Sequence, residues 1–166
     1  RNLLADPADP AAGLAMFATL TAVSFAGNGL AIIATPLAHE RMAPATWILV
    51  CLGLSAVSQL LLATTPGLLV VGVSAVLMGL GIQGGKIAVD TIVHRDTEAA
   101  YRGRAFALYD VLSNGAFVAA AALAALALPD TGWSRAVFLA VALAYVVVAA
   151  LYRRGTRLIG GDPRPA

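Results

Sequence analysis

The sequence predicts an all-α membrane protein, a multi-pass bundle of five transmembrane helices. Of its 166 residues, 60% are hydrophobic and only 12% are charged, and the mean hydropathy is +0.83. Average soluble domains carry about 25% charged residues, so this composition is typical of a membrane protein. The hydrophobic residues form five runs, each long enough to cross a bilayer as a helix. Helices are favoured over strands because a helix pairs its backbone polar groups internally in hydrocarbon.

The five runs follow one another with short connections and make up a predicted transmembrane domain over residues 11–154. The connections AHERMAPAT, TTPG, HRDTEAAYRGR and PDTG carry the prolines, glycines and charges that separate the runs. In chain order, the expected helix bounds are about 14–37, 47–63, 68–93, 105–128 and 133–152. Residues 1–10, which contain two prolines, are expected to form an extracytoplasmic loop, and residues 155–166 a cytoplasmic tail. Because the chain begins at Arg1, we expect it to be a fragment of a longer protein.

The arginines predict how the helices are oriented in the membrane. Since successive loops alternate between the two sides, Arg1 and Arg135 fall on one side. Eight fall on the other side, namely Arg41, Arg95, Arg102, Arg104, Arg153, Arg154, Arg157 and Arg164. The positive-inside rule therefore predicts a cell-membrane protein whose amino end is outside and whose carboxyl end is cytoplasmic. Trp47 and Trp133, each at the start of a helix, are expected in the interfacial belt.

Polar residues inside the runs indicate which helical faces avoid lipid, because a helix that contacts only lipid needs none. The first, third and fourth runs carry such residues at spacings of three, four or seven, which is one helical face. The fifth run carries almost none and is expected to face lipid. The candidate substrate or gate residues are Ser24, Asn28, Gln83, Lys86, Asp90, Arg104, Asp110 and Asn114.

Lys86, Asp90 and Asp110 are the ionisable residues predicted within the membrane. At about 1.5 Å per residue, Lys86 lies roughly 10 Å and Asp110 roughly 9 Å inside the cytoplasmic end. An unpaired charge near the bilayer centre costs about 2.5 to 3.5 kcal/mol, so we expect Lys86 to pair with Asp90 or Asp110. One interpretation is a structural ion pair that locks two helices together. The other is a gate or proton relay in a transport path, with Asp90 and Asp110 protonated in turn.

Other functional classes find little support in the sequence. The single cysteine, Cys51, lies within a helix and excludes an intrachain disulfide or a cysteine metal cluster. Ser24 and Ser113 have no histidine partner within the membrane, so neither an enzyme nor a cofactor is expected. The basic residues follow membrane topology and lack interleaved aromatics, which argues against a nucleic-acid partner. The expected partner is the lipid bilayer.

The segment RGRAFALYDVLSN at 102–114, preceded by KIAVD at 86–90, resembles the carboxyl-terminal half of a major facilitator superfamily transporter. The resemblance covers nearly the whole chain after Pro10 and implies that the five runs are helices eight to twelve. In that superfamily an RG-containing loop commonly separates helices ten and eleven, and helices eight, ten and eleven border a central cavity. The loop TPLAHERMAPATW at 35–47 departs from the repeated family signature, since only Arg41 fits it well.

The resemblance implies secondary, proton-coupled transport of a small molecule by a carrier of which this chain is a part. The amino-terminal helices that would complete the carrier are then an expected partner. The alternative is a membrane scaffold or partner subunit whose polar faces bind the helices of another protein.

Overall fold

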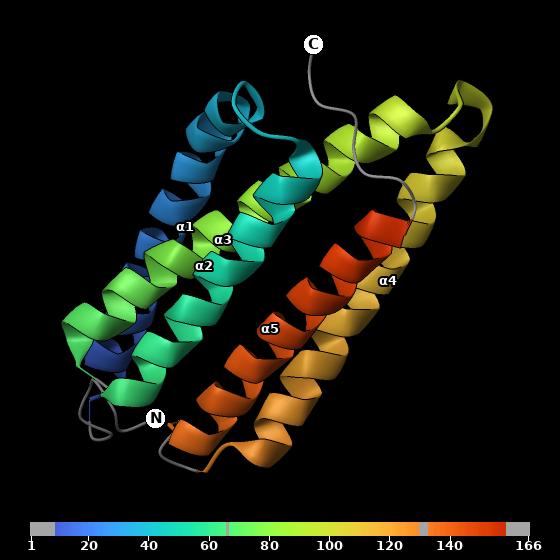
Figure 1. Cartoon of the computed structure of the whole chain (residues 1–166). Helices are drawn as coiled ribbons and strands as arrows, with labels where there is room; N and C mark the ends of the chain where they lie inside the picture. Colours follow the sequence, from blue (N-terminus) through green and yellow to red (C-terminus); the bar gives the residue numbers. More distant parts are fainter. Residues whose placement is uncertain (1–8, 66, 130–132, 159–166) are drawn as a thin grey trace.

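Five helices make up the structure over the residues that it describes. The computed structural model describes residues 9–65, 67–129 and 133–158 and contains no strand in them (Figure 1). The helices are α1 (Pro10–His39), α2 (Pro44–Thr64), α3 (Leu68–Asp96), α4 (Ala99–Ala127) and α5 (Arg135–Leu158). All five are long and apolar enough to cross a membrane. The predicted all-α fold with five candidate transmembrane helices is therefore confirmed.

Helices α3, α4 and α5 extend beyond their apolar runs at one end, because the charged residues that flank those runs are also helical. Helix α1 begins at Pro10, where the Asp9 carboxylate accepts the N–H groups of Ala11 and Ala12 at 3.0 Å each. Only Thr97 and Glu98 separate α3 from α4, so most of the connection predicted at 94–104, with its RG motif, is helical. Helix α5 likewise runs to Leu158, into the predicted tail. The rest of the predicted loop and tail, residues 1–8 and 159–166, lies outside the described residues.

Helix α3 is the centre of the fold and packs against both α1 and α2 through glycines. A Cβ atom at Gly79 would collide with the Ser24 carbonyl of α1. On the side of α2, a Cβ atom at Gly84 would lie 2.9 Å from the sulfur of Cys51. Gly27 of α1 approaches the Val76 backbone equally closely. Since only glycine leaves room for these crossings, Gly27, Gly79 and Gly84 allow the three helices to meet here.

A small core closes the end of the bundle where α1 leads into α2. Its buried members are Ala38, Trp47, Ile48, Cys51 and Ala88. Trp47 is buried and donates from Nε1 to the hydroxyl of Thr35, which is fully buried, over 3.1 Å. Trp47 thus faces the protein interior and not the interfacial belt predicted from its position at a helix start. The hydrogen bond explains this, because a buried indole N–H needs an acceptor and α1 supplies one.

The residues around the start of α5 bind the last turn of α2. Trp133 donates from Nε1 to the Leu62 carbonyl over 2.8 Å. Arg135 donates to the carbonyls of Ala63 and Thr64 over 2.8 and 3.3 Å. The last carbonyls of a helix have no partner within it, so these donors satisfy groups that hydrocarbon would leave unpaired. They also fix α5 along α2, which it contacts over its length.

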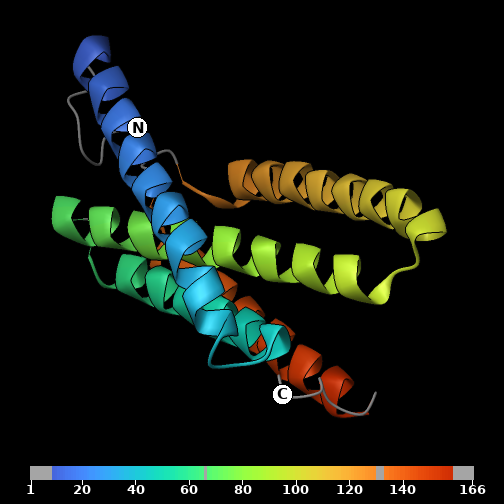
Figure 2. The same ribbon diagram turned by 90° about the horizontal axis from the view of Figure 1, so that it is seen from above.

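Helix α4 stands apart from the other four helices. Figure 1 draws it beside α5, but the view from above in Figure 2 separates the two and places α4 along one side of α3. None of the described residues of α4 is buried. Its specific contacts with the bundle involve the second half of α3, where the candidate site lies.

Candidate functional site

Lys86 and Asp90 form an ion pair on successive turns of α3. The distance from Lys86 Nζ to Asp90 Oδ2 is 3.6 Å, and the two side chains are 46% and 32% exposed. Asp90 Oδ1 is buried and has no hydrogen-bond partner among the described residues. The pair therefore leaves one buried carboxylate oxygen without a partner, and nearly half of the Lys86 side chain exposed.

Lys86 also connects α3 to α4. Its Nζ atom lies 5.2 Å from the centre of the Tyr109 ring, which is a cation–π distance. Nearer the α3–α4 connection, the rings of His94 and Phe106 lie 4.9 Å apart in a tilted arrangement. Contacts of this kind contribute about 0.5 to 2 kcal/mol each, so α4 is held to α3 by a few weak interactions and not by a packed core.

A groove opens beside Lys86 between α4 and the rest of the bundle. Its volume is about 400 Å³, and α2, α3, α4 and α5 all contribute to its walls. The walls are mainly apolar, and the polar groups among them include Lys86, Tyr109, Ser113 and Tyr145. The groove places one cation among aromatic and hydroxyl groups, an arrangement suited to a solute or to a further helix.

Asp110, Asn114 and Arg104 lie on α4 but do not join the Lys86–Asp90 pair. All three residues are exposed. The Asn114 amide donates to the backbone carbonyl of Asp110 over 2.8 Å, within the same helix. Among the described residues, the Asp110 carboxylate has no ion-pair or hydrogen-bond partner. Of the two acids considered as partners of Lys86, the structure brings Asp90 within reach, and Asp110 points elsewhere.

Ser24, Asn28 and Gln83 belong to the packing between helices. Ser24 and Asn28 of α1 lie against Gly79 of α3, with the Asn28 Oδ1 atom 3.0 Å from where a Cβ atom of Gly79 would be. Gln83 is half-buried one turn further along α3. These three residues therefore lie at or near the α1–α3 crossing, whereas Lys86 faces the groove on the side of α4.

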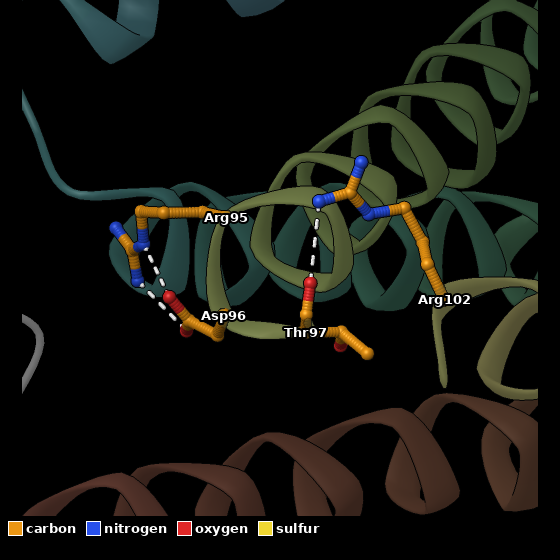
Figure 3. A network of polar contacts seen from close by, with 4 residues as sticks. All are labelled: Arg95, Asp96, Thr97 and Arg102. Carbon is orange, nitrogen blue, oxygen red and sulfur yellow. Dashed lines mark hydrogen bonds and ion pairs between the residues drawn. The ribbon is translucent and has the colours of Figure 1, made fainter. Parts of the chain in front are cut away.

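Two arginines form polar contacts around the connection between α3 and α4 (Figure 3). Arg95 pairs with Asp96 at 2.7 Å, and Arg102 donates to the Thr97 carbonyl over 3.2 Å. Arg102 thus folds back from the first turn of α4 onto the end of α3. The contact between Arg102 and Thr97 stabilises the turn between α3 and α4, and Arg104 takes no part in it.

The sequence reasoning missed a polar contact centred on the sulfur of Met78. Ser58 and Gln59 of α2 and Tyr145 of α5 approach Met78 Sδ at 3.6, 3.7 and 3.9 Å. Ser58 and Gln59 are buried, and Tyr145 is half-buried. The polar residues were visible in the sequence, but a thioether is a weak acceptor and gives no pattern that marks it as their partner.

The described residues contain no group of three or more histidine, cysteine, aspartate or glutamate side chains placed to hold a metal ion. The arrangement around Lys86 is suited to ion pairing, hydrogen bonding and proton exchange. Comparison with known proteins adds nothing to this description, since no protein-family model, no curated protein and no solved structure matches the chain.

Proposed function

We propose that this chain forms part of a secondary transporter of the major facilitator type and that Lys86 lies at the inner mouth of its solute path. The observation that carries the proposal is the position of Lys86, which bridges α3 and α4 at the edge of an open groove. Ionisable groups within transmembrane helices are rare and usually belong to substrate or proton pathways. Five apolar helices and the resemblance of residues 86–90 and 102–114 favour the same class.

The proposed mechanism uses the loose attachment of α4. Carriers of this type alternate between two states by rocking one group of helices against another. The few contacts between α3 and α4 would break and reform at small cost. Protonation of Asp90 would remove its attraction for Lys86 and free the ammonium group for a solute. Proton binding would thereby be coupled to the position of α4.

The test is transport by the assembly that contains this chain. The chain, tagged at its carboxyl end, is purified with its associated helices and reconstituted into liposomes with a pH-sensitive dye inside. A panel of small solutes is then screened for solute-dependent proton flux. We expect Lys86→Leu and Asp90→Asn to abolish the flux, because each removes one member of the ion pair. Lys86→Arg should retain part of the flux because the positive charge remains.

The matched control is Asp96→Asn, since Asp96 is an exposed acid on α3 that pairs with Arg95 away from the groove. It should leave the flux unchanged. Protease protection checks that every variant inserts normally. Normal insertion with unchanged flux in Lys86→Leu would reduce the Lys86–Asp90 pair to a structural role and reject the proposal.

One observation favours the second candidate function, a membrane scaffold or partner subunit. Helix α4 buries none of its described residues, which is the condition expected of a surface that binds other helices. A scaffold would retain its partners in Lys86→Leu, because no step depends on the ammonium group. Co-purification of partner helices with flux-inactive variants, together with the absence of flux in the wild-type assembly, would favour the scaffold.

A further inference from the structure

One face of α4 carries an exposed acid within the predicted transmembrane segment. Ala107, Asp110, Asn114, Phe117 and Ala121 follow one another at spacings of three and four, and we call this stripe the Asp110 face. All five residues are exposed, and Phe117 is 76% exposed. Such spacing places them on one side of the helix, over roughly 21 Å of its length. The face is thus long enough to contact another helix along most of a bilayer leaflet.

The contacts that α4 makes with α3 do not involve the Asp110 face. Phe106 and Tyr109 contact His94 and Lys86 of α3, and Arg102 reaches Thr97. Asp110 follows Tyr109 in the sequence and therefore points about 100° further around the helix. The carboxylate has no charged or hydrogen-bonding partner among the described residues, although it lies roughly 9 Å inside the predicted cytoplasmic end. Acids at such a depth almost always pair with another group or face water.

We propose that the Asp110 face is the docking site of a further transmembrane helix, from outside residues 1–166, that carries a lysine or an arginine opposite Asp110. Charge complementarity selects this occupant, because a basic side chain at that depth would form an ion pair with the Asp110 carboxylate, and neither charge would then be left unpaired in the membrane. The amide of Asn114 would add a hydrogen bond between the two helices. A stripe with spacings of three and four favours a helix that crosses α4 at a shallow angle of about 20°.

A second copy of this chain fits the same face less well. In a symmetric dimer with its axis along the membrane normal, each residue of the face lies near its own counterpart. Two Asp110 carboxylates would then approach each other, and like charges at short distance repel. The proposal deepens the second candidate function, because it names the face of α4 and the chemistry of the helix that binds there. It rests on that function and not on transport, since it holds whether or not a solute is transported.

The test uses the chain itself and a model helix of leucine and alanine as the probe. Leu123 of α4, which is exposed, is changed to cysteine in a Cys51→Ser background and labelled with a dye. Three probes carry the acceptor dye. The matched probe has one lysine at the depth of Asp110, the second has leucine at that position, and the third has the lysine near its other end. Energy transfer in phosphatidylcholine vesicles measures the affinity of each probe. We expect the matched lysine probe to bind at least tenfold more tightly than the other two.

Two substitutions of Asp110, with Asp96→Asn as the control, test whether the preference for the matched lysine probe depends on the Asp110 carboxylate. Asp110→Asn should abolish the preference, whereas Asp96→Asn should retain it because Asp96 lies at the end of α3 and pairs with Arg95. Asp110→Lys should reverse the preference in favour of a probe with glutamate at the same depth. If Asp110→Lys does not insert, the Asn variant and the displaced lysine decide the matter.

Equal binding of the lysine and leucine probes to the unsubstituted chain would overturn the proposal and leave lipid as the cover of this face. Persistence of the preference in Asp110→Asn would overturn it equally. Ala107→Cys tests for a second copy of the chain on this face. Disulfide crosslinking of two chains, with a yield that the lysine probe does not reduce, would identify a second copy as the occupant and would also reject the proposal. These readouts involve no solute, so their failure is distinct from a failure of transport.

Discussion

Helices α3 and α4 each have 29 residues and are apolar enough to span a membrane, yet their packing is opposite. Helix α3 lies between α1 and α2 and buries Ser74, Gly79, Gly81, Gly84 and Ala88. Helix α4 contains Gly103 and Gly115, but nothing lies within 4 Å of a Cβ atom at either position. The comparison teaches that small residues allow close packing without causing it. A glycine brings helices together only where a neighbouring surface is placed to use the space.

The strongest test of the comparison exchanges glycine for valine in both helices. Gly79→Val should destabilise the bundle by about 1 to 3 kcal/mol, because the new side chain meets the α1 backbone at Ser24 and cannot be accommodated without movement. Gly115→Val on α4 should change stability by less than about 0.5 kcal/mol, because the site is open. Cys51 is the single cysteine and is buried, so its rate of reaction with a thiol dye on heating measures unfolding.

A similar effect of the two valines on Cys51 labelling would show that α4 is packed as tightly as α3. The contrast between the glycines of α3 and those of α4 would then be rejected.

A smaller effect is expected from the hydrogen bond that joins α1 to α2. Thr35→Val keeps the shape of the side chain but removes the acceptor of the Trp47 indole N–H. Hydrogen bonds between membrane helices contribute about 0.6 kcal/mol on average and up to about 1.7 kcal/mol, and this buried pair should lie in the upper part of that range. The same Cys51 assay measures it, with Thr19→Val as the control because Thr19 is exposed and bonds only within α1.

The weakest expected effect concerns the attachment of α4 itself. Tyr109→Leu removes the ring under Lys86 and should cost about 0.5 to 1 kcal/mol, whereas Tyr109→Phe should retain most of the interaction. Spin labels at the exposed positions Leu60 of α2 and Leu112 of α4, in a Cys51→Ser background, measure the distance between these helices. The leucine variant should broaden the distance distribution, and the phenylalanine variant should not. Identical distributions for the two variants would show that the Lys86 contact does not hold α4.

Much of the fold could be predicted from the sequence because membrane helices obey strict length and composition limits. The number of helices and their order followed from the apolar runs alone. The helix ends were less predictable, since the charged residues of 94–104 indicate only where the chain leaves hydrocarbon. They do not indicate where the helix stops, and Arg102 and Arg104 are in fact helical.

The candidate site was predictable in composition but not in arrangement. Lys86 and Asp90 are four residues apart on a helix, so their ion pair follows from helical geometry. The separation of Asp110 from that pair depends on the rotation of α4 about its axis, which no spacing within one helix reveals. Similarly, Ser24 and Asn28 were recognisable as a polar face, but only the position of Gly79 shows that this face packs against α3.

The sequence by itself determined five apolar helices and the pairing of residues one turn apart, because these depend on helical geometry and on the cost of leaving polar groups in hydrocarbon. Only the tertiary structure decided which faces meet, that Trp47 turns inward to Thr35, and that α4 is left with an exposed acid. Those outcomes depend on how the surfaces of separate helices fit together, and the residue spacing within one helix does not determine that fit.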